Sequence, residues 1–362
     1  MKQKIILLTT AIFLIASTLN ATVWRVNNRP YFDADFTTLQ AGIDGASSGD
    51  TLYIEASPTA YGNGTFDKQL VVIGAGYWLA ENDTTQAYTE YSRVGKLIFN
   101  AGSEGSVVEG LYIYYNSTNF TVVTINTDDI TILKNFISAI EPYGHSSSIF
   151  AIYLAGPRSN ISIKQNWIST MNYAQGTAYG IYYGGIPTNC IISNNFIRAY
   201  YYVNSGCVPI GMGTNDLTND LIINNNIIWG GIVTYHTFLV NNILVSGTYN
   251  NSVDDQTSNN LCDGIQFPDI NNNQQNVDMS TVFVDYLGYI DSDYILSSGS
   301  PAIGAGVNGG DCGVFSYDYG SIPYVLSGMP EIPAIFEAMA TSTVGTTSLP
   351  INIKASSHNE HK

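Results

Sequence analysis

The sequence predicts an all-β solenoid, a single-stranded right-handed parallel β-helix, with a short N-terminal cap helix and an irregular C-terminal extension. A short apolar motif recurs through the central third of the chain at almost constant spacing, which indicates stacked structural repeats. Apolar residues alternate within each copy, as they do in strands that bury one face. Only 12% of the residues are charged, while Gly, Asn and Tyr are abundant, and this composition favours strands and turns over helices.

The first 21 residues are typical of a secretory signal peptide. Lys2 and Lys4 precede an apolar run from Ile5 to Ser17 that is too short to cross a bilayer comfortably. We expect cleavage after Ala21 and an exported mature chain without a transmembrane segment, either secreted, periplasmic or on the cell surface. The alternative is an uncleaved N-terminal anchor.

A short helix is predicted just before the first strands. Leu39 and Ile43 are four residues apart, which places both on one face of a helix, with Asp35 as the expected N-cap and Gly45 as the stop. A solenoid must hide the apolar surface at its open end, so this helix is expected to cap the stack. The first strands are predicted at residues 51–54 and 70–73.

The repeat has the frame apolar-x-apolar-x-x-Asn-x-apolar. Its first four asparagines are spaced by 31, 29 and 31 residues, and a shorter fifth copy follows. A second strand recurs in phase, with isoleucines 29 residues apart. Each repeat therefore contains a first strand, a loop, a second strand, a bend with Asn and a third strand. The frame asparagines are Asn135, Asn166, Asn195, Asn226 and Asn242, and the isoleucines of the second strand are Ile152, Ile181 and Ile210.

The frame predicts which side chains face inward. Ile130, Ile132 and Ile137 should point into the core, and their equivalents on the next coil should stack on them about 4.8 Å away. Asn suits the bend because it tolerates left-handed backbone angles. Its amide can also bond to the Asn of the next coil, so the frame asparagines are expected to form a structural ladder.

The repeat loses its regularity toward the C-terminus. We expect the β-helix to occupy residues 22–300, followed by an irregular extension over residues 301–354 that is rich in Gly and Pro. The polar tail, residues 355–362, is expected to be disordered. Four cysteines allow three disulfide pairings in an exported chain, but Cys190 and Cys262 lie near apolar strand positions, where a buried free thiol is equally compatible. The four cysteines are Cys190, Cys207, Cys262 and Cys312.

The charge of the chain excludes one large class of partner. The net charge is −16 and becomes about −18 when the two lysines of the predicted signal are removed. From Ala199 to Ile353 there is no Lys or Arg. A nucleic-acid partner needs basic side chains against its phosphates and is not expected. A polyanion would be repelled unless a metal ion bridged the charges.

The N-terminal region resembles the pectin-lyase-like β-helix superfamily. The resemblance lies in the order of the cap helix in residues 36–43, the Gly-Asp-Thr strand in residues 48–54 and the Ile-Gly turn in residues 70–77. With the coils that carry Asn it extends to about residue 262. Segments such as Ser300–Gly306 resemble, more narrowly, uncharacterised exported bacterial β-helix proteins. The resemblance implies the fold, export, and polysaccharide as the material that many relatives cleave or bind, but a fold does not determine a function.

Catalytic residues of the kind that this resemblance implies are few. Lyases of uronates use calcium-binding acids beside a Lys or Arg base, and glycoside hydrolases use two carboxylates. The available residues are Asp128, Asp129, Arg158 and Lys164. Adjacent residues of a strand point to opposite faces, so the two aspartates favour a polar turn over a catalytic pair. Asp254 and Asp255 leave calcium possible, but no specific metal motif is present and no cofactor is expected.

Tyrosines form the more suggestive pattern. Tyr153 and Tyr182 flank inward isoleucines, so they should lie outside on neighbouring coils, where aromatic faces suit sugar rings. Stacking that only stabilises the surface of the sheet is the alternative. We therefore expect an exported, monomeric, non-catalytic protein whose β surface binds polysaccharide. The alternatives are a polysaccharide lyase or glycoside hydrolase, and a structural or adhesive surface protein.

Overall fold

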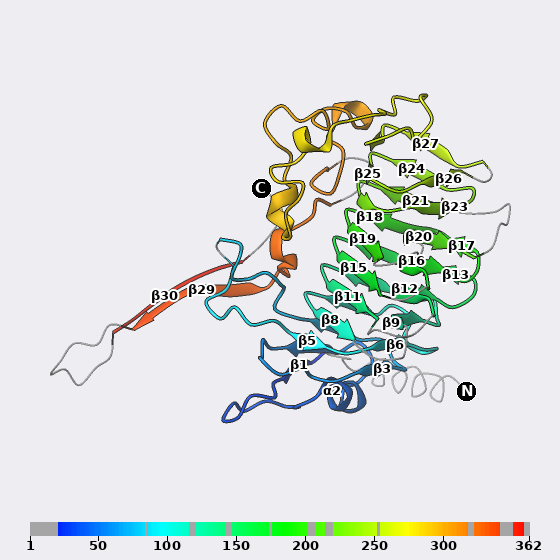
Figure 1. Ribbon diagram of the computed structural model, residues 1–362. Helices are drawn as coiled ribbons and strands as arrows, with labels where there is room; N and C mark the ends of the chain where they lie inside the picture. Colours follow the sequence, from blue (N-terminus) through cyan, green and yellow to red (C-terminus); the bar gives the residue numbers. More distant parts are fainter. Residues whose placement is uncertain are drawn as a thin grey trace, which may run out of the picture.

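Figure 1 shows the computed structural model of the chain, which describes residues 21–83, 85–115, 121–141, 147–173, 176–201, 207–213, 220–251, 254–317, 322–340 and 350–357. Apart from Ala21, the predicted signal peptide lies outside these residues, and so does most of the predicted tail. Within the described residues, no helix has both the length and the apolar character needed to cross a membrane.

The chain winds through three sheets, and each coil of the central region adds one strand to each of them (Figure 1). Sheet A consists of β1 (Val23–Val26), β2 (Thr51–Ile54), β4 (Val71–Ile73), β7 (Val107–Glu109), β10 (Thr131–Leu133), β14 (Ser162–Lys164), β18 (Cys190–Ser193), β21 (Leu221–Asn224), β24 (Phe238–Val240) and β27 (Gln256–Ser258). Sheet C consists of β5 (Arg93–Val94), β8 (Tyr112–Tyr115), β11 (Phe136–Ile140), β15 (Trp167–Asn172), β19 (Phe196–Tyr201), β22 (Ile227–Trp229), β25 (Ile243–Val245) and β28 (Leu261–Cys262). Sheet B consists of β3 (Gly64–Phe66), β6 (Leu97–Phe99), β9 (Thr121–Ile125), β12 (Ile149–Leu154), β16 (Ala178–Tyr183), β20 (Cys207–Met212), β23 (Ile232–Thr234) and β26 (Tyr249–Asn251).

Neighbouring strands in these three sheets pair in parallel, and the repeat frame sets their register. Ile132 pairs with Ile163, and the same column continues through Ile192 and Ile223. All four side chains are completely buried. Burying an isoleucine contributes about 1.5–3 kcal/mol, so each coil adds several such terms to one continuous core. The predicted parallel β-helix and its inward isoleucines are confirmed.

The frame asparagines form a ladder along the bend between sheets A and C. The Nδ2 of Asn135 donates to the Oδ1 of Asn166 at 3.1 Å, and the same bond recurs at 3.0 Å on each following coil. The ladder runs past Asn242 to Asn260 and Asn273. Each ladder amide is almost fully buried, so these bonds satisfy groups that would otherwise be costly to bury.

The left-handed residue of the bend is one position earlier than expected. Lys134 and Gln165 both have φ of 53°, and asparagines occupy this position on the later coils, whereas the ladder asparagines have ordinary φ values. A single Asn was expected both to take the left-handed conformation and to form the ladder. The structure divides these two roles, because the left-handed residue turns the chain and thereby aims the following amide into the stack.

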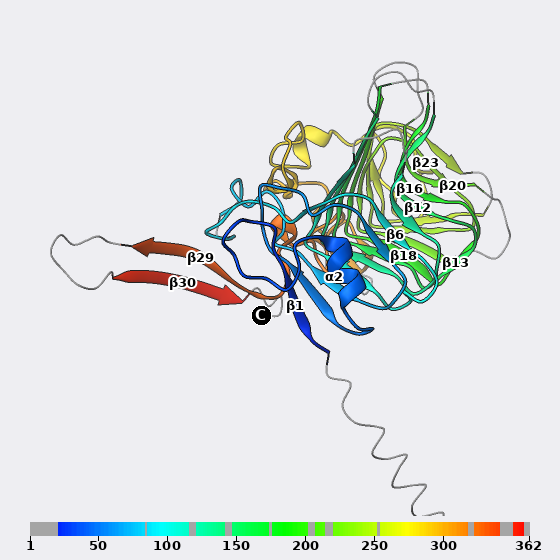
Figure 2. The same ribbon diagram turned by 90° about the horizontal axis from the view of Figure 1, so that it is seen from below.

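The cap helix is present as α2 (Leu39–Gly45), and it lies across the end of the stack (Figure 2). Leu39 and Ile43 are buried against the first coil, as predicted. Its N-cap is Thr38, whose hydroxyl accepts from the amide of Ala41, so the expected Asp35 cap is wrong. The Asp35 carboxylate instead accepts the backbone N–H of β1 at 2.7 Å.

The parallel stack ends earlier than predicted. Its last strand is β28, followed by one isolated parallel bridge between Leu261 and Gln274. Residues 275–300, assigned to the β-helix from sequence, instead begin the extension. The described part of this extension contains four short 3-10 helices, η1 (Met279–Thr281), η2 (Asp291–Tyr294), η3 (Val307–Gly309) and η4 (Leu326–Gly328).

The extension folds back along the outer face of sheet C (Figure 1, yellow and orange). There it buries an apolar row with one residue from each coil, including Trp167, Phe196 and Ile227. The left-handed residues of the bend also contact it, since the amide of Asn194 donates to the carbonyl of Val314 at 2.8 Å. The extension is therefore irregular in backbone but firmly packed.

A buried carboxylate joins the extension to the N-terminal coils. Asp291 is fully buried and accepts from the Asn82 amide at 2.7 Å, the Ser327 backbone N–H at 2.6 Å and the Tyr324 hydroxyl at 3.1 Å. The Tyr324 hydroxyl is in turn 2.6 Å from that of Tyr77. Burial raises the pKa of Asp291, and the hydrogen bonds oppose this rise.

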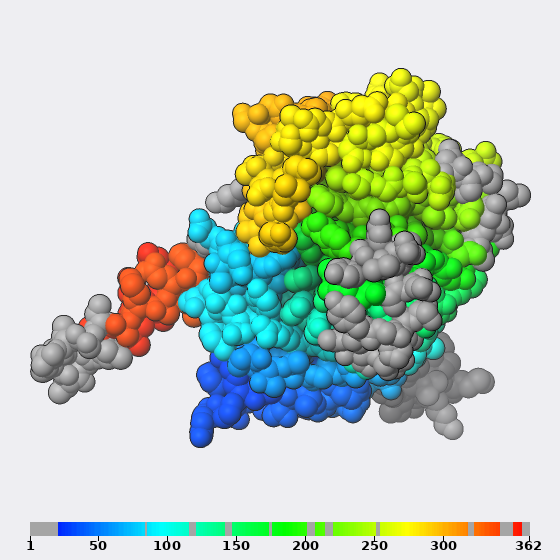
Figure 3. All heavy atoms as spheres, viewed as in Figure 1, coloured from blue at the N-terminus to red at the C-terminus, as the bar shows by residue number. Residues whose placement is uncertain are grey.

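Near the C-terminus the chain forms an antiparallel pair, β29 (Pro333–Ala340) and β30 (Ile351–Ser357), which projects from the body (Figure 3). The irregular backbone predicted up to residue 354 and the disorder predicted from Ala355 are therefore wrong for this pair, because Ala355 pairs with Ile335 and Ser357 with Pro333. Polar composition suggested disorder, whereas backbone pairing with a partner strand orders these residues. Another short parallel pair, β13 (Arg158–Ser159) with β17 (Pro187–Thr188), lies at the turn before sheet A.

Candidate functional site

The two adjacent aspartates lie in the turn before β10 and make separate bonds. Asp128 accepts the backbone N–H of Ser159 at 2.9 Å, and its carboxylate is 3.9 Å from the Arg158 guanidinium. Asp129, which has a left-handed φ of 57°, accepts from the Asn160 amide at 2.7 Å. Both carboxylates thus tie one turn to the turn of the next coil. This agrees with the polar-turn interpretation of the pair.

The lysines of the repeats do not join these aspartates. Lys164 ends β14, and among the described residues no ion pair within 4.0 Å joins it to Asp128 or Asp129. Burial lowers the pKa of Lys164. Lys134 occupies the left-handed bend position and is buried, with its Nζ 3.7 Å from a Glu331 carboxylate oxygen. The structure therefore brings Arg158 to Asp128 and leaves Lys164 apart from them.

The second acidic pair divides in a similar way. Asp255 accepts from the hydroxyls of Thr234 at 2.7 Å and Tyr249 at 2.9 Å and from the Thr237 backbone N–H at 2.8 Å. Burial raises the pKa of Asp255. Asp254 is 3.9 Å from the His236 ring. Among the described residues, no group of three or more His, Cys, Asp or Glu side chains is arranged to hold a metal ion.

The four cysteines are all free thiols in this structure. Cys190, Cys262 and Cys312 are buried, and Cys207 is half-buried. Burial raises the pKa of the Cys207 thiol to about 11. The alternative of free thiols therefore describes this structure, and none of the three possible disulfide pairings is formed in it.

The predicted tyrosines belong to a cluster of four aromatic rings on the outer face of sheet B, which we call the aromatic plate. Tyr153 stacks on Tyr182 with centroids 6.0 Å apart and planes inclined by 12°. Phe150 stacks on Tyr179 at 5.0 Å and 7°. The four rings, with Thr121 and Ser148, line a hollow of about 330 Å³.

The plate depends on the local backbone. Phe150 and Tyr153 are three residues apart yet both face outward, because Ala151 and Ile152 between them are both buried. The next coil repeats this pattern with Tyr179 and Tyr182. On the coil after that, Gly211 pairs with Tyr182, and a Cβ at Gly211 would lie 3.0 Å from the Tyr179 ring. The glycine leaves space for the rings to lean over the next coil.

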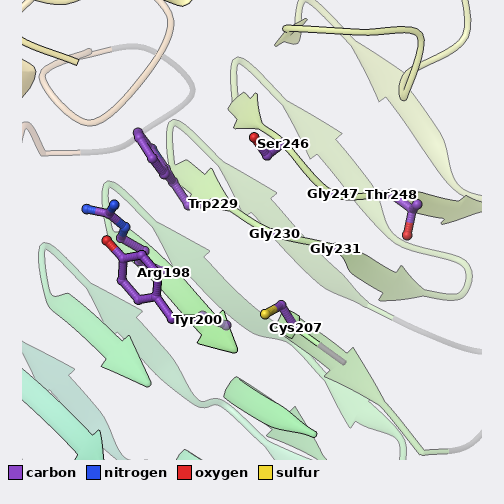
Figure 4. Close-up of a pocket in the computed structure, with 10 residues that line it drawn as sticks. Arg198, Tyr200, Cys207, Trp229, Gly230, Gly231, Ser246, Gly247 and Thr248 are labelled. Carbon is purple, nitrogen blue, oxygen red and sulfur yellow. The ribbon is translucent and has the colours of Figure 1, made fainter. Parts of the chain in front are cut away.

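A second hollow, of about 410 Å³, lies at the corner between sheets C and B (Figure 4). The Arg198 guanidinium carbon is 4.0 Å from the centroid of the Tyr200 ring and 4.2 Å from that of Trp229. Arg198 and Trp229 are paired neighbours of β19 and β22, so their side chains lie side by side on the same face. We call this feature the arginine corner.

Glycines leave the floor of the arginine corner without side chains. Gly230, Gly231 and Gly247 lie between Trp229 and Thr248 (Figure 4). Gly230 and Gly247 have φ of 117° and 81°, and a Cβ on Gly247 would lie only 2.3 Å from the carbonyl carbon of Gly230. Close approach of successive coils thus requires glycine here, and the absence of side chains opens the hollow.

Sequence reasoning missed the arginine corner. Arg198 follows the ladder residue Asn195 by three positions, and Trp229 follows Asn226 by three. The repeat frame therefore already placed the two residues on neighbouring coils, facing the same way. Comparing the residues at every position of the repeat frame, and not only at its apolar and Asn positions, would have shown that Arg198 and Trp229 are neighbours. Their contact with Tyr200 and the glycine floor depends on the corner between two sheets.

No family model and no curated protein matches the sequence. Among solved structures, the pectate lyase Pel9A is similar over 83% of this chain and 97% of its own, with 12% sequence identity and a TM-score of 0.39. The DFA-IIIase from Arthrobacter chlorophenolicus A6, in complex with GF2, is similar over 65% of this chain and 77% of its own, with 12% identity and a TM-score of 0.27. These likenesses concern the fold alone.

Proposed function

We propose that this protein is exported and binds polysaccharide without cleaving it, and that the aromatic plate is the binding surface. The observation that carries the proposal is the pair of stacked ring columns, Phe150 on Tyr179 and Tyr153 on Tyr182. These columns line a hollow on the outer face of sheet B. Aromatic faces offer apolar contact to the C–H faces of a sugar, while tyrosine hydroxyls donate to its oxygens.

The arrangement of the ionisable residues supports a role in binding rather than catalysis. Cleavage of a glycosidic bond needs an acid and a base within reach of one bond. Asp128 and Asp129 are held in bonds between successive turns, and among the described residues no ion pair within 4.0 Å joins Lys164 to either of them. Thr121 and Ser148, which line the plate with the rings, carry neutral hydroxyls.

The test is a panel of polysaccharides offered to the mature protein, with and without calcium. Retention in affinity electrophoresis measures binding, and new reducing or unsaturated ends measure cleavage. Replacing Tyr153 and Tyr182 together by Ala should weaken retention by about tenfold, since each stacked ring contributes roughly 0.5–1.5 kcal/mol beyond its buried area. The matched control replaces Tyr31 and Tyr317, two exposed tyrosines outside the plate, by Ala and should bind normally.

Each other outcome would overturn part of the proposal. New ends would disprove the non-catalytic role and direct mutagenesis to Asp128, Asp129, Arg158 and Lys164. Equal retention of both double variants would remove the plate as the binding surface. The absence of retention on every glycan would leave a structural or adhesive role in its place.

A further inference from the structure

Arg198 is an isolated cation in a strongly acidic protein. The chain has no other Lys or Arg from Ala199 to Ile353, and its net charge is −16. Across the described residues, no carboxylate lies within 4.0 Å of the Arg198 guanidinium, and its Nε is buried without a hydrogen-bond partner. Burial lowers the pKa of Arg198, and the Tyr294 hydroxyl opposes this shift. An arginine nevertheless stays protonated, so the corner keeps a positive charge.

Two aromatic rings hold this charge in place. The guanidinium carbon lies 4.0 Å from the centroid of the Tyr200 ring and 4.2 Å from that of Trp229. A guanidinium that contacts two rings has lost most of its rotamer freedom before any ligand arrives, which lowers the entropic cost of binding. Its edge still carries N–H donors in the planar arrangement that matches an oxyanion.

The surrounding hollow supplies the rest of a binding site. At about 410 Å³ it lies within the usual size range of small-molecule pockets. Ser246 and Thr248 place hydroxyls on its far side, and the glycines between them and Trp229 leave the floor open (Figure 4). A ring that carries hydroxyl groups can therefore lie on the floor, with an anionic substituent directed at Arg198.

The local acids limit how much negative charge the site accepts. Asp263 and Asp278 line the adjoining hollow on the other side of Trp229, and Asp263 accepts the Ser246 backbone N–H at 2.8 Å. A second anionic group beside the first would meet these carboxylates and the negative field of the whole chain. The hollow therefore favours one negative charge over a run of charges.

We propose that the arginine corner binds a single oxyanion, a carboxylate or a sulfate ester, carried on a hydroxylated ring such as a mono-anionic sugar. Arg198 holds the anion, and Trp229 with the glycine floor holds the ring. This site is distinct from the aromatic plate, which stacks neutral rings, so either site can fail while the other is retained.

Calorimetric titration of the mature protein with glucuronate, glucose 6-sulfate and glucose tests the proposal. Both anionic sugars should bind at least tenfold more tightly than glucose, because a charge-assisted hydrogen bond to Arg198 contributes roughly 1.5–3 kcal/mol and about 1.4 kcal/mol is tenfold in affinity. A preference for one anionic sugar over the other identifies carboxylate or sulfate as the source of the oxyanion. Arg198→Gln should lose about tenfold or more in affinity for the anions and leave glucose unchanged.

The control is Arg158→Gln, which removes an arginine that lies against Asp128 on another turn and should bind the anionic sugars normally. Added sodium sulfate should compete with glucuronate on the unmodified protein, and this measurement holds even where Arg198→Gln fails to fold. Equal affinity for glucose and both anions, no competition by sulfate, or an equal loss in Arg158→Gln would each overturn the proposal. Loss of anion binding in the double variant of Tyr153 and Tyr182 would move the site to the plate.

Discussion

The asparagine ladder offers the sharpest test of how this stack is held together. Asn195 is fully buried in the middle of the ladder. Its Oδ1 accepts from the backbone N–H and the amide of Asn166 at 2.9 and 3.0 Å. Its Nδ2 donates to the carbonyls of Ile163 and Ser193, both at 2.9 Å, and to the Oδ1 of Asn226 at 3.0 Å. Asn195→Ala removes all of these bonds without adding a steric clash.

The expected loss follows from the groups left without this partner. The Asn166 backbone N–H loses the bond that Asn195 made to it, while Ser193 keeps a bond from the Gln165 N–H at 3.1 Å. A buried polar group left unsatisfied costs about 1–3 kcal/mol, and each further bond that Asn195 makes in the ladder contributes about 0.5–1.5 kcal/mol. We expect a loss of about 3 kcal/mol in the free energy of unfolding.

Urea denaturation followed by circular dichroism and tryptophan fluorescence measures this loss. The matched control is Asn126→Ala, which removes one exposed amide bond to Asn100 and should change the free energy of unfolding by no more than about 0.5 kcal/mol. The dependence on urea should stay the same in both variants, because the surface exposed on unfolding does not change. If Asn195→Ala lost no more than Asn126→Ala, the ladder would have no stabilising role and the reasoning would be refuted.

Two further predictions concern the buried carboxylate of Asp291 and the glycine floor of the arginine corner. Because burial raises the pKa of Asp291 above its ordinary 3.8, the folded protein retains a proton that the unfolded chain releases. The stability that Asp291 contributes is therefore greatest below pH 3.8 and falls as the pH rises from 3.8 through the raised pKa. Urea titrations at several pH values should show this fall in the unmodified protein relative to Asp291→Asn. A stability difference between the two proteins that does not change with pH would contradict the prediction. Gly247→Ala and Gly299→Ala both place Ala at positive φ, 81° and 85°, but only Gly247 would clash, since nothing lies within 4 Å of a Cβ at Gly299. Thermal unfolding should show a loss of roughly 1–2 kcal/mol for Gly299→Ala and a clearly larger loss for Gly247→Ala, whereas equal losses would mean that the coils separate readily at the arginine corner.

Much of the fold could be predicted from periodic features of the chain. The spacing of Asn135, Asn166 and Asn195 defined the coil, and alternation within each copy identified the isoleucines that are now seen fully buried. Both signals recur on every coil, so stacking the coils reinforces the strand and bend that each coil already favours locally. The cap helix was predictable for the same reason, because the i, i+4 pair of Leu39 and Ile43 is local.

Some errors arose where two neighbouring residues compete for one role. The bend needs one residue with positive φ and one buried amide, and both Asn194 and Asn195 could supply either. Position decides between them, since the first residue turns the chain and the second then faces the stack. At the cap helix, Asp35 and Thr38 are both residue types that cap helices well. The Asp35 carboxylate accepts a backbone N–H of β1 instead, so Thr38 forms the N-cap.

The sequence by itself determined the coil, its inward face and the Asn row, because each is a periodic or local property of the chain. Only the tertiary structure decided that the extension, from Met279 to Phe315 and again at Tyr324 and Leu326, covers the outer row of sheet C. It likewise decided that Asp291 joins Asn82 across 209 residues. It also decided that Arg198 lies between Tyr200 and Trp229 over a floor of glycines. Such contacts join segments that share no repeat, and their free energy comes from burial and pairing that exist only once the coils are stacked.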